Sequence, residues 1–527
     1  MLFKSLTFLF ISVICIAMII VDTLAEMIFY LQFNMLIMKY VFNHYYYLRH
    51  DKFRTLMYNK ISKHNNPDYS TDWLQKIHPI YAMLFSFFSS PIELSDAVDK
   101  VTKFLCIEKK QAEKIISIFL ENKEEFHTRY SNSVNNFPKN VIIREELLEN
   151  PIKKYYPEMF AYSSVDVSSV RLYESPIHIT FMLTNKCITN CIYCYADRNM
   201  RYKALSFDVV ERFIKDAYDS QIRWINVDGG DFFLYPHWKK LLKTLEKYNY
   251  IPELVSTKFP ISKNDFDFFA TFSIPLQISI DSFDQNVLDM MVGKIENYSE
   301  KLKRTLSMIN EERSFQVATI LTKFNGYIEN LEDMYSYLST LENMRRWEIR
   351  VAFKSLYSKN DFEDFQISTD SIKKIETWIV NKRKTSSIDI VWSPSKQDAF
   401  FKSSKGSKDF EGARCSANST HMFVLPDGNV TICEQLYWDN RFIIGNIINS
   451  KISDIWNSDR AKYLANIPQN DISIDSACRN CSIFSECYKS MNRCFANIMK
   501  IYGKDNIDYP DPRCNKAPRD ISKKIYV

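Results

Sequence analysis

The chain has 527 residues, enough for two to four domains with their own hydrophobic cores. Hydrophobic residues make up 46% of it and aromatic residues 15%, which excludes a disordered chain. Its 68 basic and 63 acidic residues leave a formal charge of only +5 and no long basic block, so the composition does not indicate a nucleic-acid partner.

Residues 1–37 form an apolar N-terminal segment whose role the sequence leaves open. Ser5–Val21 is an uncharged run, short for a membrane-spanning helix and long for the core of a signal peptide. Basic residues from Lys39 onward would keep the rest of the chain in the cytoplasm if the segment spanned a membrane. Translation from Met35 or Met38 is the other alternative. The expected location is cytoplasmic, with membrane contact through residues 1–37 left open.

A small α+β domain is predicted over residues 38–135. Two short apolar strands, at 45–48 and 55–58, flank a charged turn, which is typical of a hairpin. A short sheet followed by helices indicates a winged-helix-like fold, and a simple cap on the next domain is the alternative interpretation. Three stretches have the apolar spacing of helices, at 73–89, 91–105 and 109–126.

Beyond a serine-rich linker at 163–169, strands and helices alternate through residues 170–388. Such alternation is typical of a parallel sheet closed by crossover helices. We therefore predict an α/β fold, a partial (β/α)6 TIM-like barrel with its active site at the carboxyl ends of the strands. The predicted strands are 177–183, 224–227, 254–256, 276–280, 316–321 and 347–353, and the predicted helices are 207–220, 238–248, 301–310 and 334–342.

Three cysteines follow the first predicted strand of this barrel: Cys187, Cys191 and Cys194. Their spacing lets three thiolates converge from one loop on a single iron-sulfur cube. A cube needs four ligands, so one iron would stay open for a ligand that is not protein. Thiolate-rich sites also suit zinc, for which His178 is the nearby fourth ligand, and isolated buried thiols are a further alternative.

Seven more cysteines gather near the C-terminus, and we predict a separate domain over residues 389–520. Short strands at 421–424 and 429–432 join through a turn at 426–428. Clustered cysteines in so long a chain favour metal ligation in a reducing compartment over a disulfide scaffold. The domain is therefore predicted to be held together by metal more than by a large core. The seven are Cys415, Cys433, Cys478, Cys481, Cys487, Cys494 and Cys514.

The Cys187-x3-Cys191-x2-Cys194 motif resembles the signature of radical S-adenosylmethionine (SAM) enzymes. Tyr193 stands where many members have an aromatic residue, and we expect it to contact the cofactor. The resemblance implies a 4Fe-4S cluster on the three thiolates, whose open iron binds the amino and carboxylate groups of SAM. It also implies that the reduced cluster cleaves SAM to a 5′-deoxyadenosyl radical.

The same resemblance implies further cofactor contacts. Gly229-Gly230-Asp231 resembles the family's Gly-Gly-Glu segment, whose backbone meets the amino group of SAM. Ser279 resembles a strand-end serine that contacts the ribose or the carboxylate, and Thr322 and Asn325 occupy the comparable place one strand later. Ordinary strand-end capping is the alternative for these three side chains.

The C-terminal cysteines resemble the SPASM domain of radical SAM enzymes that modify peptides and proteins. The pattern is Cys415-x12-Gly428-x4-Cys433, Cys478-x2-Cys481-x5-Cys487-x6-Cys494 and Cys514, with six residues before Cys494 where three are usual. The resemblance implies one auxiliary 4Fe-4S cluster on Cys478, Cys481, Cys487 and Cys514 and a second on Cys415, Cys433 and Cys494. The second auxiliary cluster lacks one ligand, for which His421 is a candidate.

The resemblance implies a peptide maturase that installs a thioether, a crosslink or a related modification. The winged-helix-like domain would hold the leader of a precursor peptide as an added strand, and flavodoxin or ferredoxin would supply electrons. Asp281 and Glu348, near strand ends, are candidate catalytic proton acceptors. A formylglycine-forming sulfatase maturase is the enzymatic alternative. A non-catalytic iron-sulfur electron carrier or scaffold is the alternative from another class.

Overall fold

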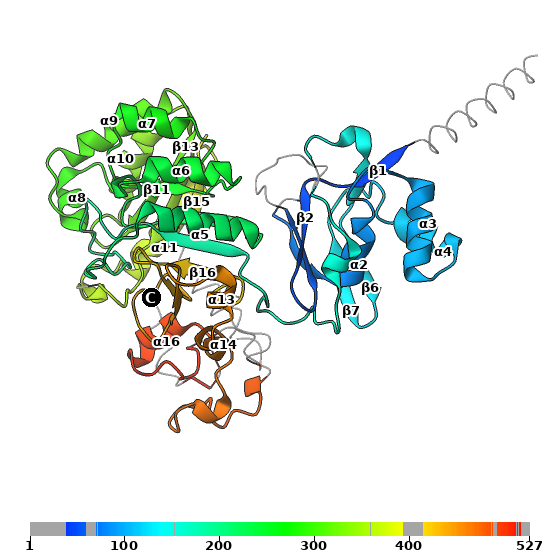
Figure 1. Ribbon diagram of the computed structural model, residues 1–527. Helices are drawn as coiled ribbons and strands as arrows, with labels where there is room; N and C mark the ends of the chain where they lie inside the picture. Colours follow the sequence, from blue (N-terminus) through cyan, green and yellow to red (C-terminus); the bar gives the residue numbers. More distant parts are fainter. Residues whose placement is uncertain are drawn as a thin grey trace, which may run out of the picture. The chain divides into compact units, whose positions relative to one another are not determined.

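The computed structural model describes residues 38–59, 70, 72–151, 153–358, 360–393, 415–485, 487, 493–512, 514 and 516–517. The chain divides into two compact units, Met1–Ser168 and Ser169–Val527, each of which is described by itself (Figure 1). The apolar segment 1–37 lies outside the described residues. Among the helices that are described, none combines the length and the apolar character needed to cross a membrane.

Unit 1 contains two three-stranded antiparallel sheets and a two-stranded hairpin. One sheet has the order β2-β3-β4: Tyr46–His50, Thr55–Asn59 and Leu74–Ile77. The other has the order β5-β1-β8: Ile92–Glu93, Lys39–Phe42 and Ile142–Arg144. β6 (Phe126–Tyr130) and β7 (Ser133–Phe137) form the hairpin. The hairpin predicted near residue 50 is present as β2 and β3.

Three helices of unit 1 follow the predicted order, but two of the predicted bounds are wrong. The stretch 73–89 does not form one helix, because residues 74–77 form β4 and Pro79 fixes the first turn of the helix that follows. The helix predicted over 109–126 ends at Ser117, and Phe126 already begins β6. The helices are α2 (Pro79–Ser86), α3 (Leu94–Leu105) and α4 (Lys109–Ser117).

The core of unit 1 is aromatic. Phe85 of α2 contacts Phe119 and Phe137 with ring centroids 4.9 and 5.8 Å apart, and all three side chains are fully buried. The expected boundary at residue 135 lies inside β7, and unit 1 continues to Ser168 through β8 and the 3-10 helix Pro157–Phe160.

Unit 2 contains all six strands predicted for the barrel, which confirms the α/β class. Five parallel strands form one sheet in the order β11-β12-β13-β14-β15: Val255–Thr257, Leu276–Ser279, Phe315–Leu321, Met344–Val351 and Asp389–Ser393. The other sheet has the order β10-β9-β16-β17-β18: Trp224–Asp228, His178–Met182, His421–Val424, Asn429–Thr431 and Ile443–Asn446. Between β10 and β11 the Asn226 amide bridges to Glu253 through two bonds of 3.1 Å.

Two strands that follow the domain boundary expected between residues 388 and 389 pair with strands that precede it. That boundary assigns β15 to the cysteine-rich domain, but β15 pairs in parallel with β14 and therefore belongs to the barrel sheet. It follows helix α11 (Thr369–Lys382) and completes one more strand-helix-strand unit. β16, from the C-terminal region, pairs in parallel with β9. The cysteine-rich region and the barrel thus share a sheet.

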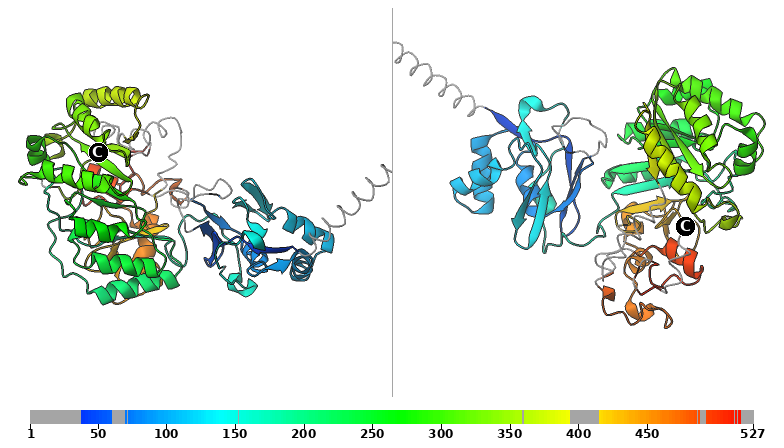
Figure 2. Two further views of the ribbon diagram at one scale, coloured as in Figure 1. Left: turned by 90° about the horizontal axis from the view of Figure 1, so that it is seen from above. Right: turned by 180° about the vertical axis from the view of Figure 1, so that it is seen from behind.

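Helices cover the outer face of the parallel strands (Figure 2). α5 shows why, because Val210, Phe213, Ile214 and Ala217 recur at helical spacing and are buried on one side. α10 begins six residues before the predicted start at 334. The covering helices are α5 (Phe207–Asp219), α6 (Trp238–Lys247), α7 (Lys263–Ala270), α8 (Gln285–Val292), α9 (Tyr298–Asn310), α10 (Ile328–Leu338) and α11.

The C-terminal part of unit 2 continues from β16 into an antiparallel meander and short helices. Gly428, at φ +85°, supplies the left-handed residue of the turn between β16 and β17. The helices are α13 (Ile452–Trp456), α14 (Asp459–Ala465) and α16 (Phe495–Tyr502). Trp456 is fully buried and its Nε1 donates to the Leu172 carbonyl at 2.7 Å, which fixes this part to the start of the barrel.

Candidate active site

The loop after β9 brings three thiols together at the carboxyl end of the sheet. β9 ends at Met182, and Cys187, Cys191 and Cys194 follow it. The Thr189 hydroxyl lies between two of them, 3.1 Å from Cys187 Sγ and 3.3 Å from Cys191 Sγ. The arrangement matches the expectation that the motif stands at a strand end, where parallel barrels place their active sites.

Hydrogen bonds from other parts of the chain hold this loop in place. The Asn190 N–H donates to the Val292 carbonyl at 2.7 Å, which ties the loop to the end of α8. The Arg198 guanidinium donates to the carbonyl of Thr189 and, at 3.4 Å, to that of Cys187. The loop is therefore held from both sides in the shape that gathers the thiols.

Burial opposes ionisation of these thiols. It raises the pKa of Cys191, against the opposing effect of Lys258, and it raises the pKa of Cys194 to about 11. A negative charge on Cys187 also raises the pKa of Cys191 and that of Cys194, which indicates that the three thiols are neighbours. Ligation deprotonates thiols, and a positively charged metal centre would supply the compensation that burial demands.

A single zinc ion and an iron-sulfur cube require different spacings of the thiols that bind them. Over the described part of the chain, no three thiol, imidazole or carboxylate groups stand close enough to hold a single metal ion. Sulfurs around one zinc are about 3.8 Å apart, given tetrahedral bonds of 2.3 Å. In a cube each thiolate binds a different iron, so the ligands stand farther apart. His178, the alternative zinc ligand, begins β9 and lies a strand length from the loop.

Gly229 and Gly230 pack their backbone against the segment that leads into the thiol loop. The Gly230 N–H donates to the Thr184 carbonyl at 2.6 Å, and the Asp231 N–H donates to the Lys186 carbonyl at 2.8 Å. A Cβ atom on Gly230 would lie 2.0 Å from the Lys186 carbonyl oxygen, and one on Gly229 would lie 2.8 Å from that of Thr184. Only glycine fits this close approach.

The Asp231 carboxylate is a structural anchor, in place of the cofactor contact expected there. It is 1% exposed and accepts hydrogen bonds from the Thr257 hydroxyl at 2.8 Å and from the N–H groups of Lys258 and Phe259 at 3.0 Å. Its contacts join the Gly-Gly segment to the loop after β11. Asp231 thereby positions the backbone from which the Lys258 side chain extends.

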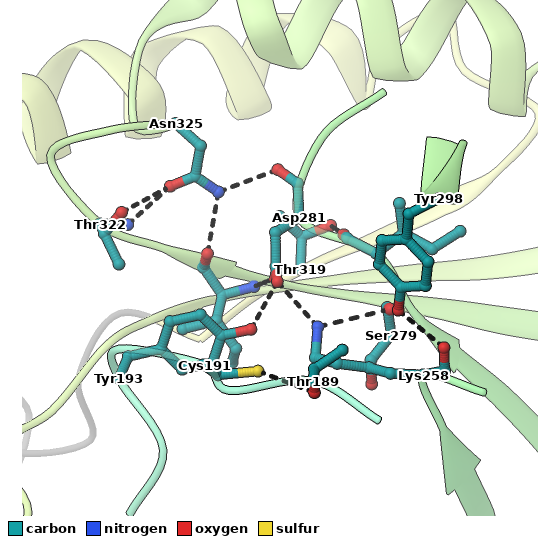
Figure 3. A network of polar contacts seen from close by, with 12 residues as sticks. Thr189, Cys191, Tyr193, Lys258, Ser279, Asp281, Tyr298, Thr319, Thr322 and Asn325 are labelled. Carbon is teal, nitrogen blue, oxygen red and sulfur yellow. Dashed lines mark hydrogen bonds and ion pairs between the residues drawn. The ribbon is translucent and has the colours of Figure 1, made fainter. Parts of the chain in front are cut away.

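Asp281 is the centre of a buried polar network at the end of β12 (Figure 3). Its Oδ2 accepts from Lys258 Nζ at 2.7 Å and from the Tyr193 hydroxyl at 2.5 Å, and its Oδ1 accepts from the Ile320 N–H at 2.9 Å. The side chain is 1% exposed. A buried carboxylate that already accepts hydrogen bonds from a cation and two further donors is a weak proton acceptor. The geometry assigns Asp281 and the Tyr193 hydroxyl positioning roles, in place of the expected proton transfer and cofactor contact.

Lys258 was not predicted from the sequence, and it places a cation beside the thiols. Its Nζ also donates to the Ser279 carbonyl at 3.4 Å. Burial lowers the pKa of Lys258, but Asp281 and the neighbouring Cys191 and Cys187 outweigh burial and hold that pKa above its ordinary value. The ammonium therefore stays charged where an anionic cluster or a carboxylate would bind.

The three strand-end side chains named by the resemblance differ in accessibility. The Ser279 hydroxyl is partly exposed and lies 3.2 Å from that of Ser256. Thr322 and Asn325 are fully buried, and the Asn325 amide is used within the protein: Oδ1 accepts from Thr322 N at 2.7 Å, and Nδ2 donates to the Asp281 carbonyl at 2.9 Å. The Ser279 hydroxyl therefore remains accessible to a ligand, whereas Asn325 supports the backbone of Asp281 and Thr322 supports Asn325.

Glu348, the other candidate proton acceptor, is paired with a cation. Its Oε1 and Oε2 accept from the Arg350 guanidinium at 2.7 and 2.5 Å. Burial raises the pKa of Glu348, but the bonds to Arg350 outweigh burial and hold that pKa below its ordinary value. A bidentate ion pair makes this carboxylate a weak base, so Glu348 serves as an anchor in place of the expected catalytic role.

Four of the C-terminal cysteines line one pocket. Burial raises the pKa of Cys487 to about 11, and the buried Arg493 opposes this effect. Arg493 is held by the Tyr509 carbonyl at 2.6 Å. A thiol-lined pocket with a fixed cation suits an anionic cluster. The thiols are Cys478, Cys481, Cys487 and Cys514, the set implied for one auxiliary cluster.

The other three C-terminal cysteines are also close to one another. Burial raises the pKa of Cys433 strongly, and Cys494 and Cys415 add to the shift. The structure thus brings Cys494 near Cys433 despite the longer interval before it. His421, the candidate for the missing ligand, points its Nε2 to the Thr180 hydroxyl at 2.9 Å, so this nitrogen is occupied within the shared sheet.

Two acidic residues that were not predicted as part of a site, Glu434 and Asp228, interact with each other. Glu434 follows Cys433 directly, and Asp228 precedes Gly229 directly. Burial and then Asp228 raise the pKa of Glu434 to about 7, while Arg350 lowers it. Adjacency to two motif residues was the signal that the sequence offered for this pair.

Two family descriptions match the chain: "Radical SAM superfamily" over residues 181–338 and "Iron-sulfur cluster-binding domain" (SPASM) over residues 415–482. The chain therefore contains a radical SAM domain and a SPASM domain. The first domain binds SAM and a 4Fe-4S cluster, and the second binds auxiliary iron-sulfur clusters.

Its relatives include the "antilisterial bacteriocin subtilosin biosynthesis protein AlbA" of Bacillus subtilis, 22% identical over 306 residues, which are 56% of this chain and 62% of AlbA. The "S-adenosylmethionine-dependent nucleotide dehydratase RSAD2" of Siniperca chuatsi is 23% identical over 192 residues, 36% of this chain and 53% of that protein. The chain thus spans less than two thirds of either curated relative.

The fold is similar to that of Streptococcus suis SuiB, which has been solved with S-adenosylmethionine and with the precursor peptide SuiA. For both structures the TM-score is 0.60 at 15% identity, and the match covers 90% of this chain and 100% of SuiB. Such coverage includes part of unit 1, because residues 169–527 make up only about two thirds of the chain. The likeness establishes the fold.

Proposed function

We propose that this protein is a radical SAM maturase that modifies a ribosomally made peptide. The observation that carries the proposal is the presence, in one compact unit, of the three-thiol loop and of a separate pocket lined by four thiols. SuiB has this fold and was solved with a precursor peptide, and AlbA is named for bacteriocin biosynthesis. A peptide substrate with a leader segment is therefore the class that the comparisons favour.

SAM and the reduced cluster would supply a 5′-deoxyadenosyl radical that removes a hydrogen atom from the peptide. Cys187, Cys191 and Cys194 would hold the cluster. The backbone at Gly229 and Gly230 and the Ser279 hydroxyl would orient SAM. Lys258 would face the anionic groups, held in place by Asp281. The sheet that the barrel shares with the cysteine-rich region would keep the auxiliary site close to the substrate.

The remaining features of the proposal concern partners and location. The leader would bind to unit 1 as an added strand, and a flavodoxin or ferredoxin would reduce the clusters. The many free cysteines of the two thiol-rich regions favour a reducing compartment such as the cytoplasm. The product would be a thioether, a crosslink or a related modification of the peptide.

The test uses the full chain, purified and reconstituted without oxygen. With dithionite and SAM we expect 5′-deoxyadenosine, and co-expression with any short reading frame found beside the gene should change the mass of the peptide that it encodes. Cys191→Ala should abolish both, whereas Cys106→Ala, outside the clusters and exposed, should change neither. Zinc in the three-thiol loop, or no 5′-deoxyadenosine from the wild-type protein, would favour a scaffold and overturn the proposal.

A further inference from the structure

The hairpin of unit 1 leaves one strand edge open. β6 and β7 pair from Phe126↔Phe137 to Tyr130↔Ser133 around a two-residue loop. The closing pair of such a hairpin is hydrogen-bonded, and bonded pairs alternate along the strands. His127 and Arg129 are therefore at non-bonded positions, and their N–H and C=O groups point away from β7. No other strand in the described part of unit 1 pairs with β6.

The other strand edges described in unit 1 are covered or very short. On β2, the Leu48 N–H donates to the Tyr155 hydroxyl at 3.0 Å. β4 has β7 alongside it, and the His78 N–H after it donates to Asn135 Oδ1 at 2.7 Å. β8 is covered by the segment that follows α4, and β5 has two residues. An added strand thus finds its longest free edge on β6, not on the three-stranded sheet.

An exposed aromatic cluster lies beside this edge. The Tyr130 ring contacts that of His78 at 4.7 Å, and His78 contacts Tyr162 at 5.1 Å. Tyr130 is 44% exposed and Tyr162 is 36% exposed. Side chains of an added strand that lie opposite Thr128 and Tyr130 would share their face of the sheet and would reach this cluster. Alternate apolar residues in the added strand would therefore be favoured.

The charge of the edge selects between two kinds of added strand. Arg129 and His127 project from the solvent face of β6, and Arg129 forms no ion pair with any described residue. If a second copy of this chain added its own β6, it would set these basic side chains against each other. An acidic residue opposite Arg129 would be attracted instead.

We propose that the free edge of β6 binds an extended peptide as an added strand, with an acidic side chain opposite Arg129 and apolar side chains on the Tyr130 and Tyr162 cluster. This inference rests on the proposed function, in which the occupant is the leader of the substrate. It places the leader on the outer strand of the hairpin, because β7 already lies along the edge of β4.

The experiment selects short random peptides on phage against the full-length protein and uses the tightest synthetic binder as the probe. Hydrogen exchange should show protection in residues 126–130. Arg129→Pro removes an N–H that points outward and leaves the bonds to β7 intact, so we expect binding to weaken about tenfold or more. Arg129→Ala keeps the N–H and should weaken binding only a few-fold. Arg129→Glu should favour a probe whose acidic residue is replaced by lysine.

Protection that maps to β4 or to unit 2, binding unchanged in Arg129→Pro, or the absence of any binder would overturn the inference. 5′-Deoxyadenosine formation without peptide is measured in the same preparations and should be equal in the wild type and Arg129→Pro. A protein that binds the probe at β6 but never cleaves SAM would refute the proposed function alone. A protein that cleaves SAM but does not bind at β6 would refute this inference alone.

Discussion

Single residues at the site are fixed by contacts that leave little freedom. Gly230 is pressed against the Lys186 carbonyl, and Asp281 uses both of its oxygens within the protein. The thiols, the Ser279 hydroxyl and the ammonium of Lys258 are partly exposed at the site. The residues that support the site therefore outnumber those that would touch a cofactor, and substitutions of supporting residues should disturb cluster binding as well as stability.

Gly230→Ala should prevent the thiol loop from adopting its shape. The new Cβ would lie 2.0 Å from a backbone oxygen that belongs to the loop, so the backbone must move, at a cost of about 3 kcal/mol or more. Iron content after reconstitution and the thermal midpoint should both fall. Gly503→Ala is the control outside the site: its Cβ meets nothing closer than 3.9 Å, so only its backbone conformation, φ +95° and ψ 158°, opposes it, by about 1–3 kcal/mol, and iron content should not change.

Lys258→Met should destabilise the fold and make the cluster harder to reduce. It would leave the buried Asp281 without its cation, which costs about 3–5 kcal/mol, and it would remove a positive charge beside Cys191. Urea unfolding and the midpoint potential of the cluster are the measurements. Lys258→Arg should restore the potential, and Lys258→Met with Asp281→Asn should recover part of the stability. An unchanged potential in Lys258→Met would contradict the electrostatic role.

At the level of elements, the pairing of β16 with β9 joins the cysteine-rich region to the barrel. His421 pairs with His178 across these strands, and its side chain bonds to Thr180 of β9. The hydrogen bond between His421 and Thr180 is largely shielded from water, and burial disfavours the charged form of the imidazole. The junction between the two regions is therefore expected to respond to acid.

Stability should fall as the pH decreases from about 6.5 towards 4, because of His421. Burial lowers its pKa to about 4, whereas an unfolded histidine titrates near 6.5, so the folded state binds fewer protons in this window. The contribution is fully present above about pH 6.5 and is lost as the pH falls, by about 3 kcal/mol in all. Urea unfolding of His421→Gln should show a flatter profile, and the exposed His127→Gln should keep the wild-type slope.

At the level of the whole molecule, the structure separates the three-thiol loop from the four-thiol pocket within unit 2. One is the loop after β9, and the other is the pocket that contains Cys478 and Cys481. The first lies beside the expected SAM contacts and the second does not. Loss of one site should therefore leave the other loaded.

Cys191→Ala and Cys481→Ala should each remove one cluster, about 4 of roughly 12 iron atoms per chain. Only Cys191→Ala should stop formation of 5′-deoxyadenosine, because Cys481 lines the other pocket, to which no residue of the three-thiol loop contributes. Cys481→Ala should instead lose modified peptide. Iron and sulfide analysis with chromatography of the nucleoside products tests both. Equal loss of SAM cleavage in the two variants would contradict the separation of the sites.

The sequence by itself determined the order of the strands, the three-thiol loop and the seven further cysteines, because hydrophobic periodicity and ligand spacing are local properties of a chain. Only the tertiary structure decided which polar side chains are free. Asp281 and Glu348 are equally plausible bases in the sequence, yet Arg350, two residues along β14, neutralises Glu348, and Lys258, from the loop after β11, neutralises Asp281 through a contact between segments far apart in the sequence. The same reason explains why β15 belongs to the barrel: strand pairing is a long-range contact, and local pattern does not record it.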